Sequence, residues 1–492
     1  MLTLILLLLS AVLLFKIYFI RYQNYWRKQN VIQIDGVVNR FMFGKRSLGE
    51  IYKEIMDENP SQPYIGIFLG SSPTLLLRDL KDIESVLQSN FNCFNNRGIV
   101  TNPQEPLTDN MLFTNNYNRW KLMKQTFSPM LTNTKIKIMF QYIHKSARDF
   151  LDPINNDKEC SLRDMYAFGT SIIAASIFAI DQTTSIVNTL TDMFWDINEA
   201  SKKNNIIFYI SNTFPEIFKL LNFKHFDKYN ELFVNFVKQI IENRRKDNDV
   251  SRQDIVQSVL QLQKNGIIKD ETTGYEIIPT DELVAAQYFL FFLGGIDNIS
   301  ISLHFAMLEL AHNKYILDRL HNEIDIVFEN CNDKINFEEL GKLEYLDMII
   351  SELLRKYPPV LALQRCCTSD TTLPSTQAKV YKGTTILVPV FALHRDPKLF
   401  PDPELFDPDI FSSRNQCKIT KFSYLPFGEG QRKCLGVRFE RILLKFSIAV
   451  ILRKCTVKEN KYEPNAYDHS FFSLRDSSAH FILIPRNKVN YS

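Results

Sequence analysis

A chain of 492 residues with a net charge of only +3 lacks the excess of positive charge that typifies nucleic-acid-binding proteins. Its eight cysteines include no C-x-x-C pair, which argues against a zinc knuckle and against a small disulfide-rich scaffold. The 38 phenylalanines predict a large aromatic core and are compatible with a roomy apolar pocket.

Residues 1–20 predict a transmembrane anchor. Residues 2–15 are apolar apart from Thr3 and Ser10, and after Lys16 the apolar run continues to residue 20, close to the ~20 residues that span a bilayer. A secretory signal peptide is the alternative, but no charge precedes the run and no A-x-A site ends it. Basic residues follow the run, so the positive-inside rule places the rest of the chain in the cytosol.

After the anchor, residues 21–45 predict a polar connector, and residues 46–492 predict one large domain because no linker divides them. Residues 64–79 (YIGIFLGSSPTLLLRD) predict a β-hairpin around a Gly-Ser-Ser-Pro turn. Helical patterns dominate from there to about residue 355, and residues 384–393 (TTILVPVFAL) predict a buried strand. We therefore expect a mainly α fold with small β-sheets.

The longest predicted helix begins after Thr280, a suitable N-cap, and continues to about residue 312. Gly294 and Gly295 lie in its middle, and each costs about 1 kcal/mol against alanine, so the pair needs a local reason. Helical side chains tilt toward the N-terminus, so Asn298 is expected to lean over Gly294. The two glycines therefore predict a notch in the helix beside polar side chains.

The strongest motif lies in residues 426–446 (PFGEGQRKCLGVRFERILLKF), where Gly430 and Gly436 flank a single thiol, Cys434, just before a predicted helix. A thiolate near a helix N-terminus is stabilised by free N–H groups and by the helix dipole. The glycines let the backbone approach a bulky, flat group, and Arg432 adds positive charge. A lone cysteine is more often a buried structural residue, but this pattern favours a thiolate ligand for a metal cofactor that bears anionic groups.

The pattern F-x-x-G-x-R-x-C-x-G resembles the haem-binding signature of the cytochrome P-450 superfamily, and it is met in full by Phe427, Gly430, Arg432, Cys434 and Gly436. The resemblance implies that Cys434 is the axial thiolate ligand of the iron of haem b, a ligation that favours O–O cleavage. It also implies the fold of that superfamily, with a long central helix over the haem and the cysteine-ligand loop beneath it.

Other segments extend the resemblance. Glu352 and Arg355 in ISELLRKYPP share a helix face and resemble the structural E-x-x-R pair of the family. Trp120 and Lys124 in NRWKLMKQ are four residues apart and resemble the helix that holds the haem propionates. Arg365 resembles a further propionate contact, and Arg432 resembles another.

Two positions depart from the family pattern. Ile410 replaces the arginine that completes a triad with Glu352 and Arg355, and we expect the lost buried partner to cost about 1–3 kcal/mol unless another group substitutes for it. Asn298 replaces the threonine whose hydroxyl helps to protonate bound dioxygen. The adjacent Asp297 is expected to feed protons through water beside Gly294.

The resemblance implies a haem-thiolate monooxygenase that inserts one oxygen atom of O2 into a lipophilic xenobiotic, plant toxin, insecticide, or endogenous lipid or hormone. Electrons would come from NADPH through NADPH-cytochrome P-450 reductase, with cytochrome b5 as a further partner and no nucleic acid. The closest pattern is that of insect detoxification enzymes, anchored in lipid of the endoplasmic reticulum membrane with the catalytic domain in the cytosol. Two alternatives stay open: a non-oxygenating or peroxide-using haem-thiolate enzyme, and a catalytically impaired haem-dependent binder.

Overall fold

The computed structural model describes residues 25–486 apart from residues 45, 71, 112–115, 179–183, 199–205, 208–209, 212–213, 248–253, 464 and 472. The anchor predicted at residues 1–20 lies outside the described residues. The described helices are α2 (Val37–Gly44), α3 (Leu48–Glu58), α4 (Leu80–Glu84), α5 (Pro106–Asn110), α6 (Tyr117–Phe127), α7 (Asn133–Leu151), α8 (Leu162–Phe178), α9 (Thr184–Asn198), α11 (Pro215–Leu220), α12 (Asp227–Asp247), α13 (Ile255–Asn265), α14 (Asp281–His312), α15 (Lys314–Asn330), α16 (Phe337–Leu340), α17 (Glu344–Lys356), α18 (Val390–Leu393) and α19 (Val437–Lys454). The described strands are β1 (Gln33–Ile34), β2 (Tyr64–Leu69), β3 (Ser72–Leu77), β4 (Lys158–Ser161), β5 (Ile268–Lys269), β6 (Glu276–Ile277), β7 (Leu363–Cys366), β8 (Thr371–Thr372), β9 (Lys379–Val380), β10 (Thr385–Val388), β11 (Cys455–Lys461) and β12 (His480–Pro485).

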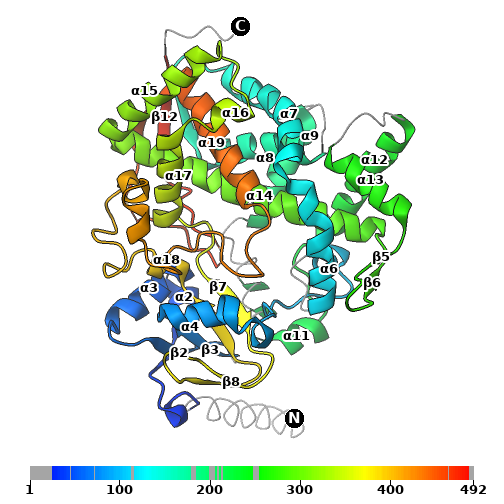
Figure 1. Ribbon diagram of the computed structural model, residues 1–492, viewed down its shortest axis with the longest axis vertical. Helices are drawn as coiled ribbons and strands as arrows, with labels where there is room; N and C mark the ends of the chain where they lie inside the picture. The colour runs from blue at the N-terminus through cyan, green and yellow to red at the C-terminus, as the bar shows by residue number, and fades with distance from the viewer. Residues whose placement is uncertain are drawn as a thin grey trace, which may run out of the picture.

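The mainly α fold with small sheets is confirmed. A helical body lies above a smaller part that is built on a five-stranded sheet (Figure 1), whose strand order is β1-β2-β3-β10-β7. The predicted hairpin is present, because β2 and β3 pair antiparallel from Tyr64 opposite Leu77 to Leu69 opposite Ser72. Strand β10 is shorter than the strand predicted over residues 384–393. It stops before Pro389, which has no N–H to donate to a sheet, and the short helix α18 follows.

Most of the connector predicted at residues 21–45 is folded onto this sheet. Strand β1 pairs parallel with β2, and the indole N–H of Trp26 donates to the carbonyl of Ile67 at 3.0 Å. Only 2% of Trp26 is exposed, and its ring fills the space that a side chain at Gly66 would occupy. An aromatic anchor of this kind, rather than a polar linker, therefore joins residues 25–44 to the domain.

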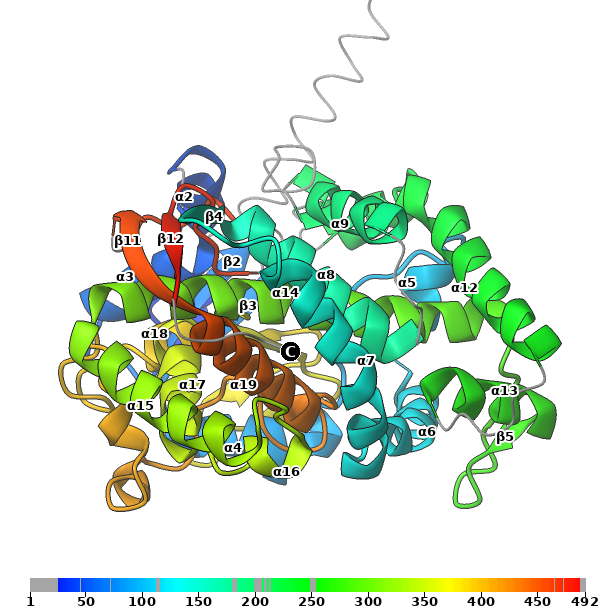
Figure 2. The same ribbon diagram turned by 90° about the horizontal axis from the view of Figure 1, so that it is seen from above.

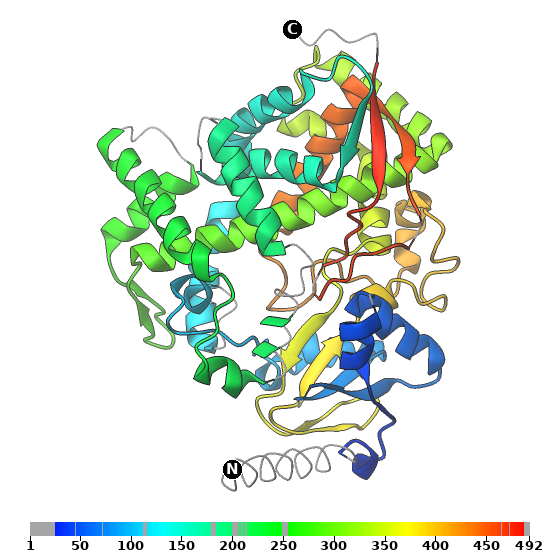
Figure 3. The same ribbon diagram turned by 180° about the vertical axis from the view of Figure 1, so that it is seen from behind.

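The central helix α14 is confirmed, with the hydroxyl oxygen of Thr280 accepting the N–H of Leu283 at 3.2 Å as its N-cap. Helices α8 and α19 pack across α14 (Figure 2), and α5, α12 and α17 contact it as well. Seen from behind, the segment between β11 and β12 passes beside α14 toward the sheet (Figure 3). Among the described helices, α14 is the one long and apolar enough to cross a bilayer, but it is mostly buried as the core helix of the domain.

Candidate functional site

The cysteine loop, residues 426–436, is held in shape by its own backbone. The N–H of Cys434 donates to the carbonyl of Phe427 at 2.9 Å, which closes the loop on itself. Gly430 has a φ of +75°, and a side chain there would overlap the carbonyl oxygen of Leu87. Gly436 is the N-cap of α19, and its N–H donates to the Cys434 sulfur at 3.3 Å. The loop therefore presents one thiol and supplies it with a backbone donor.

The Cys434 thiol lies among groups that act on its pKa in opposite directions. Its surface is exposed, yet surrounding protein atoms desolvate the sulfur, and this burial raises the pKa of Cys434 to about 11. The negative charge of Glu440 also raises that pKa, whereas the N–H of Gly436 and the charges of Arg97 and Lys124 lower it. Positive groups around the sulfur favour the thiolate form.

The two glycines of α14 serve different purposes. Gly294 is exposed in the middle of a helix that is otherwise largely buried, and a Cβ there would meet no described atom within 4 Å. A Cβ at Gly295 would lie 2.8 Å from the Cδ1 atom of Ile173, so this glycine lets α8 approach. The structure therefore places the predicted notch at Gly294 alone, and it assigns Gly295 to helix packing.

Asn298 leans over Gly294, and its Nδ2 donates to the Gly294 carbonyl at 2.7 Å. Only the NH2 end of the amide can donate to a carbonyl, so this bond fixes the orientation of the side chain. The amide keeps one further N–H and its oxygen acceptor, but unlike a hydroxyl it does not pass a proton on. Asp297 points to other partners: the hydroxyl of Tyr166 donates to its Oδ1, and Arg475 Nε lies 3.9 Å away.

Buried positive charges gather near the cysteine loop. Arg432 stacks 3.9 Å from the ring centroid of Trp120, and its Nε and Nη2 donate to the carbonyl of Asn95 at 3.0 and 2.8 Å. Arg97 Nη2 donates to the Arg432 carbonyl at 3.1 Å. Burial and the charge of Arg97 lower the pKa of Arg365 to about 9. Burial, followed by the charges of Arg97 and Arg365, lowers the pKa of Arg432 to about 8. The three guanidinium groups therefore repel one another.

Lys124 belongs to the same cluster. Its Nζ donates to the carbonyl of Gln431, and its pKa is lowered by burial and by the charges of Arg97 and Arg432. A buried cluster of like charges is stabilised by an anionic group. The predicted residues Trp120, Lys124, Arg365 and Arg432 are thus brought together near the thiol.

These residues fit a haem. The accessible thiol can ligate an iron, the open face at Gly294 leaves room on one helix, and the guanidinium cluster matches two propionates. Arg97 was not predicted, because it is a lone arginine in NNRGIV with no periodic or motif context. Among the described residues, no group of three or more His, Cys, Asp or Glu side chains could hold a metal ion.

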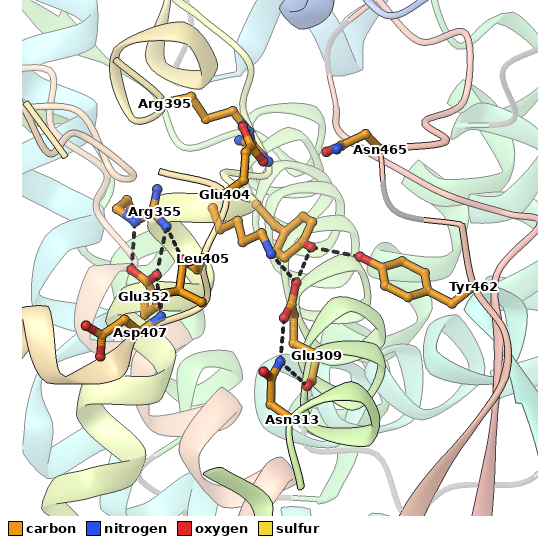
Figure 4. A network of polar contacts seen from close by, with 12 residues as sticks. Glu309, Asn313, Glu352, Arg355, Arg395, Glu404, Leu405, Asp407, Tyr462 and Asn465 are labelled. Carbon is orange, nitrogen blue, oxygen red and sulfur yellow. Dashed lines mark hydrogen bonds and ion pairs between the residues drawn. The ribbon is translucent and has the colours of Figure 1, made fainter. Parts of the chain in front are cut away.

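The Glu352–Arg355 pair is fully buried and belongs to a network of polar contacts (Figure 4). Arg355 Nε and Nη2 donate to the two carboxylate oxygens of Glu352, each at 2.7 Å. Arg355 Nη1 donates to the carbonyl of His394 at 2.9 Å, and its Nη2 also donates to that of Leu405 at 3.2 Å. The N–H of Asp407 donates to Glu352 Oε1 at 2.9 Å. Both charges are therefore satisfied.

This network corrects the expectation that Ile410 leaves the pair short of a partner. Ile410 lies in a single 3-10 turn, Pro408–Phe411, and is half-buried there. Backbone carbonyls and one backbone N–H occupy the hydrogen-bonding positions around Glu352 and Arg355. The expected cost of about 1–3 kcal/mol for an unsatisfied group therefore does not arise here.

His394 joins the network to the cysteine loop. Its Nε2 accepts the N–H of Leu425 at 2.8 Å, so the ring is neutral and its Nδ1–H donates to the carbonyl of Arg355 at 3.0 Å. Burial, together with the charge of Arg355, lowers the pKa of His394 to about 3. The unfolded chain therefore binds a proton below about pH 6.5 that the folded chain does not bind, and stability falls as the pH drops from 6.5 toward 3.

We expect His394→Gln to flatten this acid dependence, although it lowers stability at neutral pH. The free energy of unfolding should change with pH more steeply in wild type than in the variant, by up to about 1.4 kcal/mol per pH unit, because one proton is involved. Urea unfolding of the haem-loaded proteins at pH values from 4 to 7 measures both slopes. The exposed His312 is the control, and His312→Gln should keep the wild-type slope. Parallel slopes for wild type and His394→Gln would contradict this assignment.

A polar clasp that sequence reasoning missed joins residues 102–108 to the segment just before α12. Glu105 is fully buried, and its two oxygens accept the backbone N–H groups of His225 and Phe226 at 3.1 and 2.6 Å, just before α12 begins. Thr108 Oγ1 donates to the same carboxylate at 2.8 Å. Asn102 Nδ2 donates to the carbonyl of Phe223 at 2.8 Å. The carboxylate thus stabilises the N-terminal end of α12 from another part of the chain.

A family model described as "Cytochrome P450" matches residues 36–483. Cytochrome P450 6B5 of Papilio glaucus is 31% identical over 474 residues, which cover 93% of this chain and 97% of that protein. Cytochrome P450 6k1 of Blattella germanica is 29% identical over 90% of this chain and 88% of that protein. Cytochrome P450 6A1 of Musca domestica is 30% identical over 89% of this chain and 88% of that protein. All three relatives are insect proteins.

Proposed function

Since this chain belongs to the cytochrome P450 family and is therefore a haem-thiolate monooxygenase, we propose that it oxidises a lipophilic small molecule with electrons from NADPH. The observation that carries the proposal is the accessible Cys434 thiol, which receives the Gly436 N–H in a domain whose central helix opens at Gly294. We propose xenobiotics, plant toxins, insecticides, or endogenous lipids and hormones as substrates. The apolar side chains around α14 and the insect relatives support this class.

When bound, the haem supplies the binding and reductive activation of O2 at its iron. Cys434 would ligate that iron, and the Gly436 N–H would stabilise the thiolate sulfur. Arg365, Arg432, Arg97 and Lys124 would hold the propionates, with Trp120 supporting the Arg432 guanidinium from one face. Phe427 and Gly430 shape the loop, and Gly294 leaves space on the other side of the site.

The electron donor would be a membrane flavoprotein reductase, with cytochrome b5 as a further partner. We place the protein in the endoplasmic reticulum membrane, anchored by residues 1–20, with residues 46–492 in the cytosol. The uncharged start of the apolar run and the basic residues after it support this placement. A reconstituted mixture of the protein, reductase and NADPH, tested on a panel of lipophilic compounds, should yield oxidised products. A normal carbon-monoxide difference spectrum without any product across the panel would contradict the proposal.

Proton delivery is the step in which this chain differs from the family pattern. Asn298 stabilises the helix opening through Gly294, but its amide does not relay a proton, so we assign proton delivery to Asp297. We expect Asn298→Thr to raise the amount of product per NADPH consumed and to lower peroxide release, because a hydroxyl both accepts and passes protons. Product, NADPH and peroxide measured in one reaction give the ratio.

Asn313 offers a matched control for this substitution. Its Nδ2 also donates to a carbonyl four residues earlier in the chain, that of Glu309 at 2.8 Å, but it lies at the far end of α14. Asn313→Thr should leave the product ratio unchanged. If Asn298→Thr instead lowers the ratio, asparagine is adapted to a different reaction. The missing hydroxyl favours peroxide use as that second candidate function, and hydrogen peroxide would then replace NADPH and reductase.

A further inference from the structure

The side chain of Asp297 is held on the side of α14 that faces α8. The hydroxyl of Tyr166, on α8, donates to Asp297 Oδ1, and Arg475 Nε lies 3.9 Å from the same oxygen. Asp297 follows Gly294 by three residues, so its Cα lies near the open face, while its carboxylate is turned to these two partners. Neither partner was expected from the sequence, because each lies far from Asp297 along the chain.

Both partners are rigidly placed. Tyr166 is fully buried, and its ring is packed between Phe194 and Trp195 at centroid distances of 5.4 and 5.5 Å. Burial raises the pKa of Tyr166 well above its usual range, so its hydroxyl remains a hydrogen-bond donor at every working pH. Its neighbours therefore leave the Tyr166 hydroxyl in one position, directed at Asp297.

Arg475 is also buried, with 7% of its surface exposed. Its Nε donates to Ser473 Oγ at 2.9 Å, and its carbonyl accepts the N–H of Asp468 at 2.7 Å. Burial lowers the pKa of Arg475, but the neighbouring groups Tyr166, Asp297 and Asp468 more than offset this effect and raise it. The guanidinium is therefore charged, and it is fixed by the segment between β11 and β12 rather than by Asp297 alone.

We propose that Tyr166 and Arg475 are positioning residues that clamp the Asp297 carboxylate against α8 and set how readily it turns toward the open face at Gly294. This inference rests on the proposed function, in which Asp297 delivers protons. Once released, Asp297 takes one proton from solvent water, gives that proton up beside Gly294, and returns to Tyr166 as the carboxylate. No other bond changes, and the side chain ends in the state in which it began.

Tyr166→Phe removes one donor from the clamp and keeps the ring. The freed carboxylate should turn to the open face more often, so the proton-dependent step becomes faster by up to about tenfold, the scale of one hydrogen bond to a charged group. We therefore expect a higher kcat, an unchanged KM, and a solvent deuterium isotope effect on kcat that is smaller than that of wild type.

Tyr288→Phe is the matched control. Tyr288 is a buried tyrosine of α14 whose ring stacks on Phe178, and its hydroxyl has no hydrogen-bond partner among the described residues. This substitution therefore removes a buried hydroxyl without breaking a contact, and the isotope effect should equal that of wild type. An isotope effect that is unchanged or larger in Tyr166→Phe would overturn the clamp.

A double-mutant cycle tests the contact without using activity. Urea unfolding compares the haem-loaded proteins Tyr166→Phe, Asp297→Asn and the double variant. Their losses in the free energy of unfolding should be non-additive, because the two groups share one hydrogen bond. Tyr288→Phe combined with Asp297→Asn should be additive. If Tyr166→Phe and Asp297→Asn lower the free energy of unfolding additively while wild type shows normal NADPH-driven turnover, the clamp alone is overturned. No turnover in wild type would overturn the proposed function and, with it, the release step.

Discussion

Cys434→Ala should reduce NADPH-driven product formation to background and abolish the thiolate-type carbon-monoxide difference spectrum. The thiol is the residue of the cysteine loop that can donate sulfur to iron, and alanine offers no ligand. The loop should keep its shape, because the bond from the N–H of residue 434 to the carbonyl of Phe427 does not involve the side chain. The spectrum of the reduced protein under carbon monoxide and the product yield are the two measurements.

A second cysteine controls for the loss of a thiol as such. Cys417 is exposed, and its sulfur donates to a nearby carbonyl, that of Arg414, at 3.5 Å. Cys417→Ala should retain both the spectrum and the turnover. A thiolate-type spectrum that survives in Cys434→Ala would show that another cysteine ligates the iron, and the assignment of the site would be wrong.

Glu352→Gln should lower the free energy of unfolding by about 3–5 kcal/mol, because it leaves the charge of Arg355 buried without its counter-ion. That loss is a large part of the 5–15 kcal/mol that typically stabilises a folded domain. Poor recovery of haem-loaded protein is therefore expected. Urea unfolding, followed by the Soret absorbance and by circular dichroism, measures the loss of cofactor and the loss of helix separately.

Glu344 lies in the first turn of the same helix, α17, and is exposed. Glu344→Gln should change stability by less than about 0.5 kcal/mol, the usual range for a surface substitution. Replacing Glu352 and Arg355 together by Leu and Met should cost less than Glu352→Gln, because it removes both charges. A smaller loss for Glu352→Gln than for the double variant would show that the pair is not the energetic centre of the network.

Local signals in the sequence were enough for the main elements of the fold. Thr280 marks the start of α14 because an N-cap needs a side-chain acceptor, and the Gly-Ser-Ser-Pro turn marks the hairpin. The cysteine loop was predictable because its glycines, arginine and thiol are close in sequence. The predicted strand over residues 384–393 is too long, because the apolar run continues past Pro389, which has no N–H to donate to the sheet.

The contacts that could not be predicted join segments distant along the chain. Tyr166 reaches Asp297 across 131 positions, and a lone tyrosine in an apolar helix gives no sign of its partner. Arg97 carries no motif, and its role follows from its nearness to Arg365 and Arg432 in space. The cost expected for Ile410 depended on whether another group substitutes for the arginine. Backbone carbonyls supplied the missing partners, and a side-chain pattern does not reveal them.

The Glu105 clasp has a consequence for how this chain tolerates substitutions. Residues 102–108 and 222–226 share one buried carboxylate, so a substitution that displaces either segment also displaces the other. Effects of two substitutions, one in each segment, should therefore be non-additive in the free energy of unfolding. Which substitutions the two segments tolerate then depends on the order in which they accumulate, because the first alters the surroundings in which the second acts.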